Sequence, residues 1–189
     1  MSTSYVDANL YHDLVNGRAV TSILHFVNST PVEWFSKRQA AVETATYGSE
    51  FVAAKIATEQ IINLRTTLRH LGVPLVKKSL TFISGEDTDK DEISTSFLFG
   101  DNKFVITSAT IPHLGLNKRH NALAYHRVRE AVAAKILAFF HIDGKMNLAD
   151  VLSKHYSFGQ AWPLLQPILF WMGDPRKCGE DLVPLSNAN

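Results

Sequence analysis

The sequence has little cysteine, little net charge and no long apolar run. Cys178 is the single cysteine among 189 residues, which excludes an internal disulfide and is typical of a reducing compartment. The N-terminal segment MSTSYVDANLYHD contains no apolar signal region, and the longest apolar stretch, WPLLQPILFWM at 162–172, is too short to span a bilayer and holds two prolines. We therefore expect a cytoplasmic or nuclear protein that is neither secreted nor bound to a membrane.

The formal net charge of +1 selects no class of partner, but the charges are unevenly distributed. The stretch LNKRHNALAYHRVRE (116–130) is basic, whereas SGEDTDKDEIS (84–94) is acidic. Hydrophobic residues make up 46% and charged residues 20% of the chain, a balance typical of globular proteins that excludes disordered, collagen-like and coiled-coil classes. The length predicts one domain with a short tail.

The hydrophobic periodicity predicts a mixed β-sheet covered by helices, an α/β fold of the α+β mixed-sheet kind. Residues 76–94 fit no element well, and their acidic part is interpreted as a surface loop. The expected order is strand 4–8, strand 18–27, strand 32–38, helix 44–71, strand 95–100, helix 102–109, helix 126–137, strand 138–142 and helix 147–155.

Four acids stand at strand ends or beside the apolar face of a helix: Asp7, Glu50, Asp101 and Asp150. Two interpretations of Asp101 are open, because it either caps the following helix or belongs to a charged site. If the first and fourth strands are parallel neighbours, Asp7 and Asp101 lie within a few Å, and like-charge repulsion opposes this unless a cation intervenes. Hard oxygen ligands of this kind are typical of Mg²⁺ or Mn²⁺, and a pair of such ions can clamp a phosphodiester.

Several motifs in order give the chain a close resemblance to one family, the ribonuclease H domain of copia-type (LTR) retrotransposon Pol polyproteins. The motifs are YVDANL, TATYGSEFVAA, FGDNKFVITSA and NLADVLSK, and the likeness covers most of residues 4–175. The resemblance implies a ribonuclease H-like fold, a five-stranded mixed sheet flanked by helices, over residues 1–156. Residues 76–94 are longer than the link usual in the family and are expected to be an insertion loop, and residues 157–189 form an apolar extension expected to pack on the domain.

The resemblance also implies an activity, a metal-dependent endonuclease that hydrolyses the RNA strand of RNA–DNA hybrids. In the family the matching acids are catalytic and bind two Mg²⁺ ions, with Mn²⁺ as an alternative; here they are Asp7, Glu50, Asp101 and Asp150. The implied partners are the hybrid and the reverse transcriptase domain of the same polyprotein, which acts in virus-like particles in the family. No such domain lies within this sequence, which predicts a fragment or a stand-alone remnant.

Weaker expectations concern substrate contacts. Asn102 follows Asp101 and either contacts the 2′-hydroxyl of the RNA strand or caps the next helix. His141 either assists product release, as a histidine near this place does in related enzymes, or is a packed structural residue, which its strand-like surroundings favour. Contacts to the phosphates of the hybrid are expected from Lys37, Arg38, Arg119 and Arg127.

Two other functions compete with the nuclease. One is a non-catalytic nucleic-acid-binding or interaction module, which the missing upstream domain favours and the intact acids oppose. The other is a hydrolase that uses two carboxylates as general acid and base. Four gathered carboxylates argue against this second alternative, because such a group requires a metal.

Overall fold

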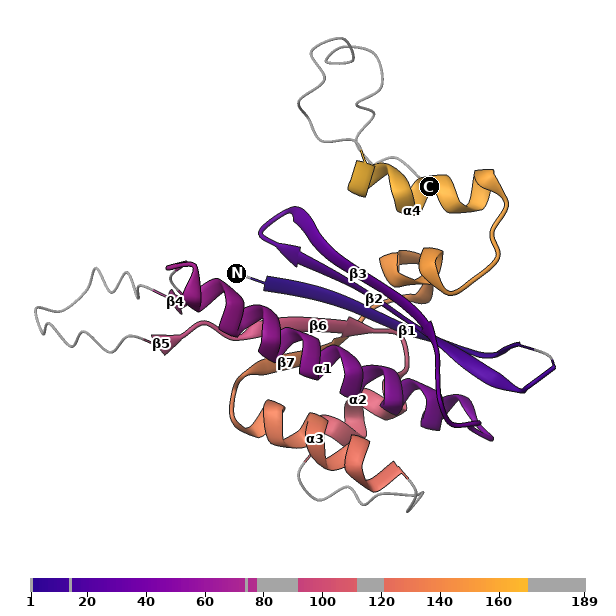
Figure 1. The fold of residues 1–189 in the computed structure, drawn as a ribbon, viewed down its shortest axis with the longest axis horizontal. Helices are drawn as coiled ribbons and strands as arrows, with labels where there is room; N and C mark the ends of the chain where they lie inside the picture. The colour runs from indigo at the N-terminus through magenta and orange to yellow at the C-terminus, as the bar shows by residue number, and fades with distance from the viewer. Residues whose placement is uncertain (1, 14, 74, 78–91, 112–120, 170–189) are drawn as a thin grey trace, which may run out of the picture.

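The computed structural model describes residues 2–13, 15–73, 75–77, 92–111 and 121–169 (Figure 1). The elements follow in the order β1 (Ser2–Asp13), β2 (Arg18–Val27), β3 (Thr30–Arg38), α1 (Thr46–His70), β4 (Val76–Lys77), β5 (Glu92–Ile93), β6 (Ser96–Gly100), α2 (Lys103–Thr110), α3 (Ala122–Ala133), β7 (Leu137–His141), the 3₁₀ helices η2 (Gly144–Met146) and η3 (Leu148–Leu152), and α4 (Phe158–Leu169).

The main sheet has five strands in the order β3-β2-β1-β6-β7. Strands β1, β2 and β3 are antiparallel neighbours, whereas β6 runs parallel to both β1 and β7. The expected mixed sheet is therefore confirmed, including the parallel pairing of the first strand with the strand that precedes Asp101. Strands β1 and β6 pair with each other only over Thr3–Tyr5 and Phe97–Phe99. Beyond these residues the two strands separate from each other, while β1 continues to pair with β2.

The hydrophobic core lies between the sheet and the helices α1, α2 and α3. Phe51 and Ile61 of α1 are fully buried there, as are Ile23 of β2 and Leu98 of β6. Strand β2 is buried along almost its whole length, because α1 packs on one face of the sheet and η3 contacts β1 and β2 as well. Burial of this strand extends to its polar side chains, His25 among them.

Two expected elements, the first strand and the helix 126–137, had boundaries that differ by several residues from the structure. Strand β1 extends to Asp13 because it continues to pair with β2 past an irregularity after Asn9. Helix α3 begins at Ala122 and ends at Ala133, earlier than the expected 126–137, because Lys135 adopts a φ of 55° that a helix does not tolerate. The expected strand 138–142 is confirmed with a shift of one residue, as β7.

The expected helix 147–155 was also wrong, since the chain there forms only the short 3₁₀ helix η3. The cause is Asn147, which is fully buried. Its Oδ1 accepts a hydrogen bond from the Ala149 backbone N–H, and its Nδ2 donates to the Val6 carbonyl at 2.9 Å. These bonds fix the start of η3 to β1 and compete with a regular helix.

The segment 76–94 begins and ends with the two-residue strands β4 and β5, which pair with each other. The rest of the expected insertion, 78–91, lies outside the described residues. Helix α4 contacts η3 and lies at the opposite end of the molecule from α3 (Figure 1). Its packing on the domain is slight, because Phe158 is 75% and Leu169 63% exposed, and the division of the chain at residue 156 stays a prediction. Within the described ranges, no helix has the length and apolar character needed to cross a membrane.

Candidate active site

Three of the four predicted acids converge at the place where β1 and β6 separate. Asp7 lies just past the residues of β1 that pair with β6, Asp101 follows the end of β6, and Asp150 lies in η3. Each of the three contributes a carboxylate oxygen to a cluster whose members all lie within 4.8 Å of one another. Asp7 and Asp150 are buried, whereas Asp101 is partly exposed.

Glu50 lies in the first turns of α1, outside the three-residue cluster but in the same cleft. Its side chain is buried and accepts a hydrogen bond from the Ala8 backbone N–H. Glu50, Asp7 and Asp101 together line a cleft of about 600 Å³, which Asn102 and Lys154 also border. The structure thus brings all four predicted acids to one location.

The acids of this cleft carry more negative charge than their surroundings neutralise. Burial, and then the charge of Asp150, raises the pKa of Asp7 to about 6, although the Ser153 hydrogen bond and Lys154 act in the other direction. Burial together with the charges of Asp7 and Asp101 raises the pKa of Glu50 well above its usual value, and burial also raises the pKa of Asp101. A bound cation would favour the ionised form of each group.

The donor atoms fit a divalent cation. Asp150 Oδ1 is buried and has no hydrogen-bond partner among the described residues, so its lone pairs are left for a ligand. The other carboxylate oxygens available at the site, on Asp7, Asp101 and Glu50, are hard donors of the kind that Mg²⁺ and Mn²⁺ prefer. No side chain with a soft sulfur or imidazole ligand belongs to the cluster.

Residues that follow Asp150 complete the site, and the sequence prediction assigned them no role. Ser153 Oγ donates to Asp7 Oδ2 at 2.5 Å, Lys154 Nζ donates to Asp150 Oδ2 at 2.6 Å, and Tyr156 Oη donates to the same oxygen at 3.0 Å. The signal was present in the motif NLADVLSK, because positions three and four residues after Asp150 lie on its side of a helical turn.

Asn102 acts as the N-cap of α2. Its Oδ1 accepts hydrogen bonds from the backbone N–H groups of Phe104 at 3.1 Å and Val105 at 3.2 Å. The capping alternative is therefore confirmed for this oxygen, and contact with a 2′-hydroxyl stays a prediction for the amide group.

Replacing Asn102 with alanine is expected to lower the free energy of unfolding by about 1 kcal/mol, because two backbone N–H groups lose their acceptor. Urea denaturation at neutral pH measures this change. Asn102→Asp, which keeps an acceptor at the cap, is the matched control and should retain most of the stability; equal losses in both variants would contradict the capping role.

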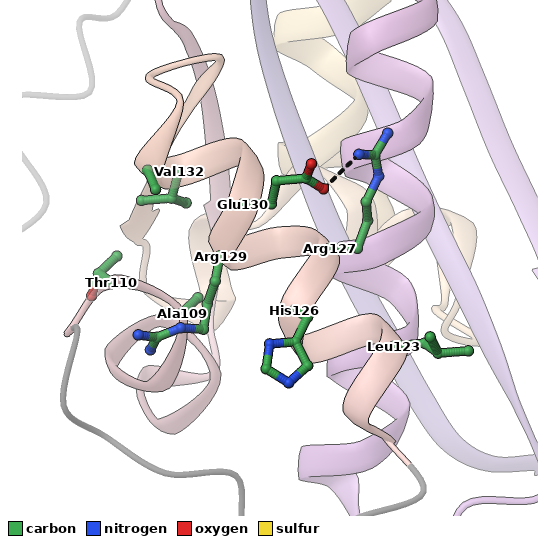
Figure 2. A pocket seen from close by; sticks show the side chains of 9 residues that line it. Ala109, Thr110, Leu123, His126, Arg127, Arg129, Glu130 and Val132 are labelled. Carbon is green, nitrogen blue, oxygen red and sulfur yellow. Dashed lines mark hydrogen bonds and ion pairs between the residues drawn. The ribbon is translucent and has the colours of Figure 1, made fainter.

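In the described part of the basic stretch, 121–130, the two arginines do not lie on one surface. Arg127 and Arg129 leave α3 on different sides, with Arg127 paired to Glu130 at 2.8 Å (Figure 2). Arg129 donates to the carbonyl groups of Ser108 and Ile111 and lies over the Tyr125 ring, which gives it a structural role. Arg119 lies outside the described residues.

The other weakly predicted residues are exposed. Lys37 and Arg38 lie at the end of the edge strand β3, and their contact with phosphates stays a prediction. His141 ends β7 and is exposed, so the expectation of a packed structural histidine was wrong. A positive charge on His141 would partly offset the rise that burial causes in the pKa of Asp101. This interaction places His141 beside the cleft. Asp143, two residues on, caps η2 through the Lys145 backbone N–H.

Comparison with solved structures assigns the fold. The chain superposes on LC11-RNase H1, isolated from compost, with a TM-score of 0.55 and 14% identity over 80% of this chain and 91% of that one. Superposition on RNase H1 from Halobacterium salinarum gives a TM-score of 0.54 and 16% identity, and covers 86% of this chain and 97% of that one. The fold is that of ribonuclease H. LC11-RNase H1 in complex with an RNA/DNA hybrid also matches this ribonuclease H-like chain, with a TM-score of 0.54 and 14% identity over 80% and 93% of the two chains.

Comparison with curated proteins confirms the resemblance to copia-type Pol polyproteins. The ribonuclease H-like chain is 25% identical over 150 residues to the retrovirus-related Pol polyprotein from transposon TNT 1-94 of Nicotiana tabacum, and 21% identical over 154 residues to that from transposon RE2 of Arabidopsis thaliana. These matches cover 79% and 82% of the chain but only 10% and 9% of the polyproteins, so the chain spans about a tenth of their length. No family model matches the sequence.

Proposed function

We propose that this chain is a metal-dependent endonuclease that hydrolyses the RNA strand of RNA–DNA hybrids, as part of the reverse-transcription machinery of a copia-type retrotransposon. The single observation that carries the proposal is the carboxylate cluster of Asp7, Asp101 and Asp150, with Glu50 in the same cleft. The ribonuclease H fold supports it, as does the similarity to the structure of LC11-RNase H1 in complex with an RNA/DNA hybrid.

The four acids would hold two divalent ions, which supply an activated water and stabilise the charge that develops on the phosphate. The residues of the chain position these ligands. Ser153 orients the Asp7 carboxylate, the Ala8 N–H orients Glu50, and Asn147 fixes η3 so that Asp150 faces the other acids. Such outer hydrogen bonds hold ligands in the geometry that metal chemistry requires.

Asn102, Lys103 and Phe104 also line the cleft, and Lys103 and Phe104 are exposed, so a substrate strand bound over them would lie beside the acids. Phe104 is 78% exposed and offers an aromatic face to a sugar or base. In this proposal Lys37 and Arg38 contact the phosphates, and His141 beside Asp101 assists product release.

Incubation of the purified chain with a labelled RNA–DNA hybrid tests the proposed function. With Mg²⁺ or Mn²⁺ we expect cutting of the RNA strand alone, with no cutting in EDTA and none of duplex DNA. Folded protein that binds the hybrid but never cuts it, with either ion, would instead support the non-catalytic binding module.

A further inference from the structure

Lys154 places a positive charge inside the carboxylate cluster. Its Nζ lies 2.6 Å from Asp150 Oδ2 and 3.8 Å from Asp7 Oδ1, and its side chain is only 33% exposed. It also borders the cleft beside Glu50 and Asp101. Among the described residues, no other lysine or arginine forms an ion pair with any of the four acids.

The position of Lys154 is fixed by the local backbone. The Lys154 N–H donates to the Asp150 carbonyl at 2.9 Å, which directs the side chain back over the residue four positions earlier. On the sheet side, the Asn9 side chain donates to the Ser153 carbonyl at 3.0 Å and Ser36 to the Leu152 carbonyl at 2.7 Å. The ammonium group is therefore held at the site by the fold.

This contact occupies an oxygen that a metal would otherwise use. Lys154 and Tyr156 both donate to Asp150 Oδ2, while Asp150 Oδ1 has no partner among the described residues. A divalent ion at the cluster would approach Asp150 on its Oδ1 side and would experience repulsion from an ammonium group a few Å away.

We propose that Lys154 is a built-in counter-cation, which stabilises the metal-free carboxylate cluster and weakens the binding of divalent ions to it. This inference rests on the metal site of the proposed function and deepens it. The side chain neutralises part of the cluster when no ion is bound, and ion binding has to overcome that contact. The metal concentration at which the site fills is thus set by a residue that is not itself a ligand.

Lys154→Met tests the inference, because methionine keeps most of the side-chain volume without the charge. Calorimetric titration of the full chain with Mg²⁺ at fixed pH and ionic strength, without nucleic acid, should show binding about tenfold tighter or more than in the wild type, since removing a like charge at this range is worth at least that factor. In EDTA the variant should have a lower Tm, and Mg²⁺ should raise its Tm by more than it raises the wild-type value.

Lys55→Met is the matched control, since Lys55 also pairs with an acid four positions away and is 37% exposed, but lies outside the cleft. It should bind Mg²⁺ as the wild type does. Lys154→Gln, which removes the charge but can still donate a hydrogen bond, separates the charge from the contact and should also bind Mg²⁺ more tightly.

Unchanged or weaker Mg²⁺ binding in both Lys154 variants would overturn the inference. If the variants are unfolded in EDTA, recovery of the folded signal at low Mg²⁺ supports it and failure to recover overturns it. Cleavage of the hybrid is a separate measurement, so tighter Mg²⁺ binding by a protein that never cuts RNA would support the counter-cation and refute the nuclease.

Discussion

Replacement of Asp101 with asparagine is expected to reduce hybrid cleavage by more than about 100-fold while leaving the protein folded. Outer hydrogen-bond partners of metal ligands typically contribute about 10–100-fold to activity, and a direct oxygen ligand should contribute more. Asparagine has nearly the same shape but supplies one neutral oxygen, which a divalent ion binds less strongly than a carboxylate. The effect on folding should be small, because Asp101 is only partly buried and burial already disfavours its charge.

The measurement is the rate of cutting of the RNA strand at saturating Mg²⁺, with hybrid binding followed separately by fluorescence anisotropy. Asp143→Asn is the matched control, since Asp143 is an exposed acid that caps η2, and asparagine caps equally well. It should cut at nearly the wild-type rate. An Asp101→Asn protein that cuts as fast as this control would refute the assignment of Asp101 to the metal site.

The metal-free protein is expected to become more stable as the pH falls from about 7 to about 5. Burial and the charge of Asp150 raise the pKa of Asp7 to about 6, so the folded state takes up a proton that the unfolded state takes up only near pH 4. Above the folded pKa the ionised, buried carboxylate destabilises the fold. As the pH falls through that value the penalty is relieved, by about 1 kcal/mol between pH 7 and pH 5 and by about 3 kcal/mol in total once the pH is below about 4.

Other groups also change their protonation in this pH range. The prediction therefore concerns the difference in the free energy of unfolding between the wild type and Asp7→Asn. Burial lowers the pKa of His25, and this group therefore removes stability as the pH falls below about 6.5. Glu50 acts in the same direction as Asp7. The His25 effect is shared by the wild type and Asp7→Asn and cancels on subtraction, and the difference that remains reports Asp7 together with its charge coupling to Glu50.

Urea denaturation in EDTA at several pH values measures this difference. Asp7→Asn should be more stable than the wild type at pH 7, and the advantage should shrink toward pH 4 to 5. Mg²⁺ should stabilise the wild type and not the variant, because an ion that binds only the folded state stabilises it. A stability difference that does not change with pH would show that Asp7 ionises normally.

The sequence was sufficient to predict the sheet because its strands have distinct patterns. The β-branched and aromatic content of β2 and the helical spacing of apolar residues in α1 each predicted the element to within a few residues of its bounds. The end of α3 was missed because Lys135 adopts a left-handed conformation that no sequence pattern marks. The form of η3 was missed because it depends on a contact of Asn147 with Val6, which is distant in the chain.

The four acids of the site were predictable because strand ends meet at one edge of a sheet and because the motifs occur in the family order. The charged and hydrogen-bonding neighbours of these acids were harder to predict from the sequence. Lys154 and Ser153 look like solvated residues after a helix, and only the fold reveals that they reach Asp150 and Asp7. Arg127 and Arg129 are close in sequence on α3 but point to different sides of it (Figure 2), and contact of Arg127 with phosphates stays a prediction.

The hydrogen bond between Ser153 and Asp7 joins residues 146 positions apart. A site closed by such a contact forms only after nearly all of the described chain has been synthesised and has folded, and such long-range contacts form slowly. A chain that stops before η3 would lack Asp150 and Ser153, so its carboxylate cluster would be incomplete. In the proposed nuclease, activity would consequently depend on completion of folding, and a premature stop before η3 would yield a chain with an incomplete site.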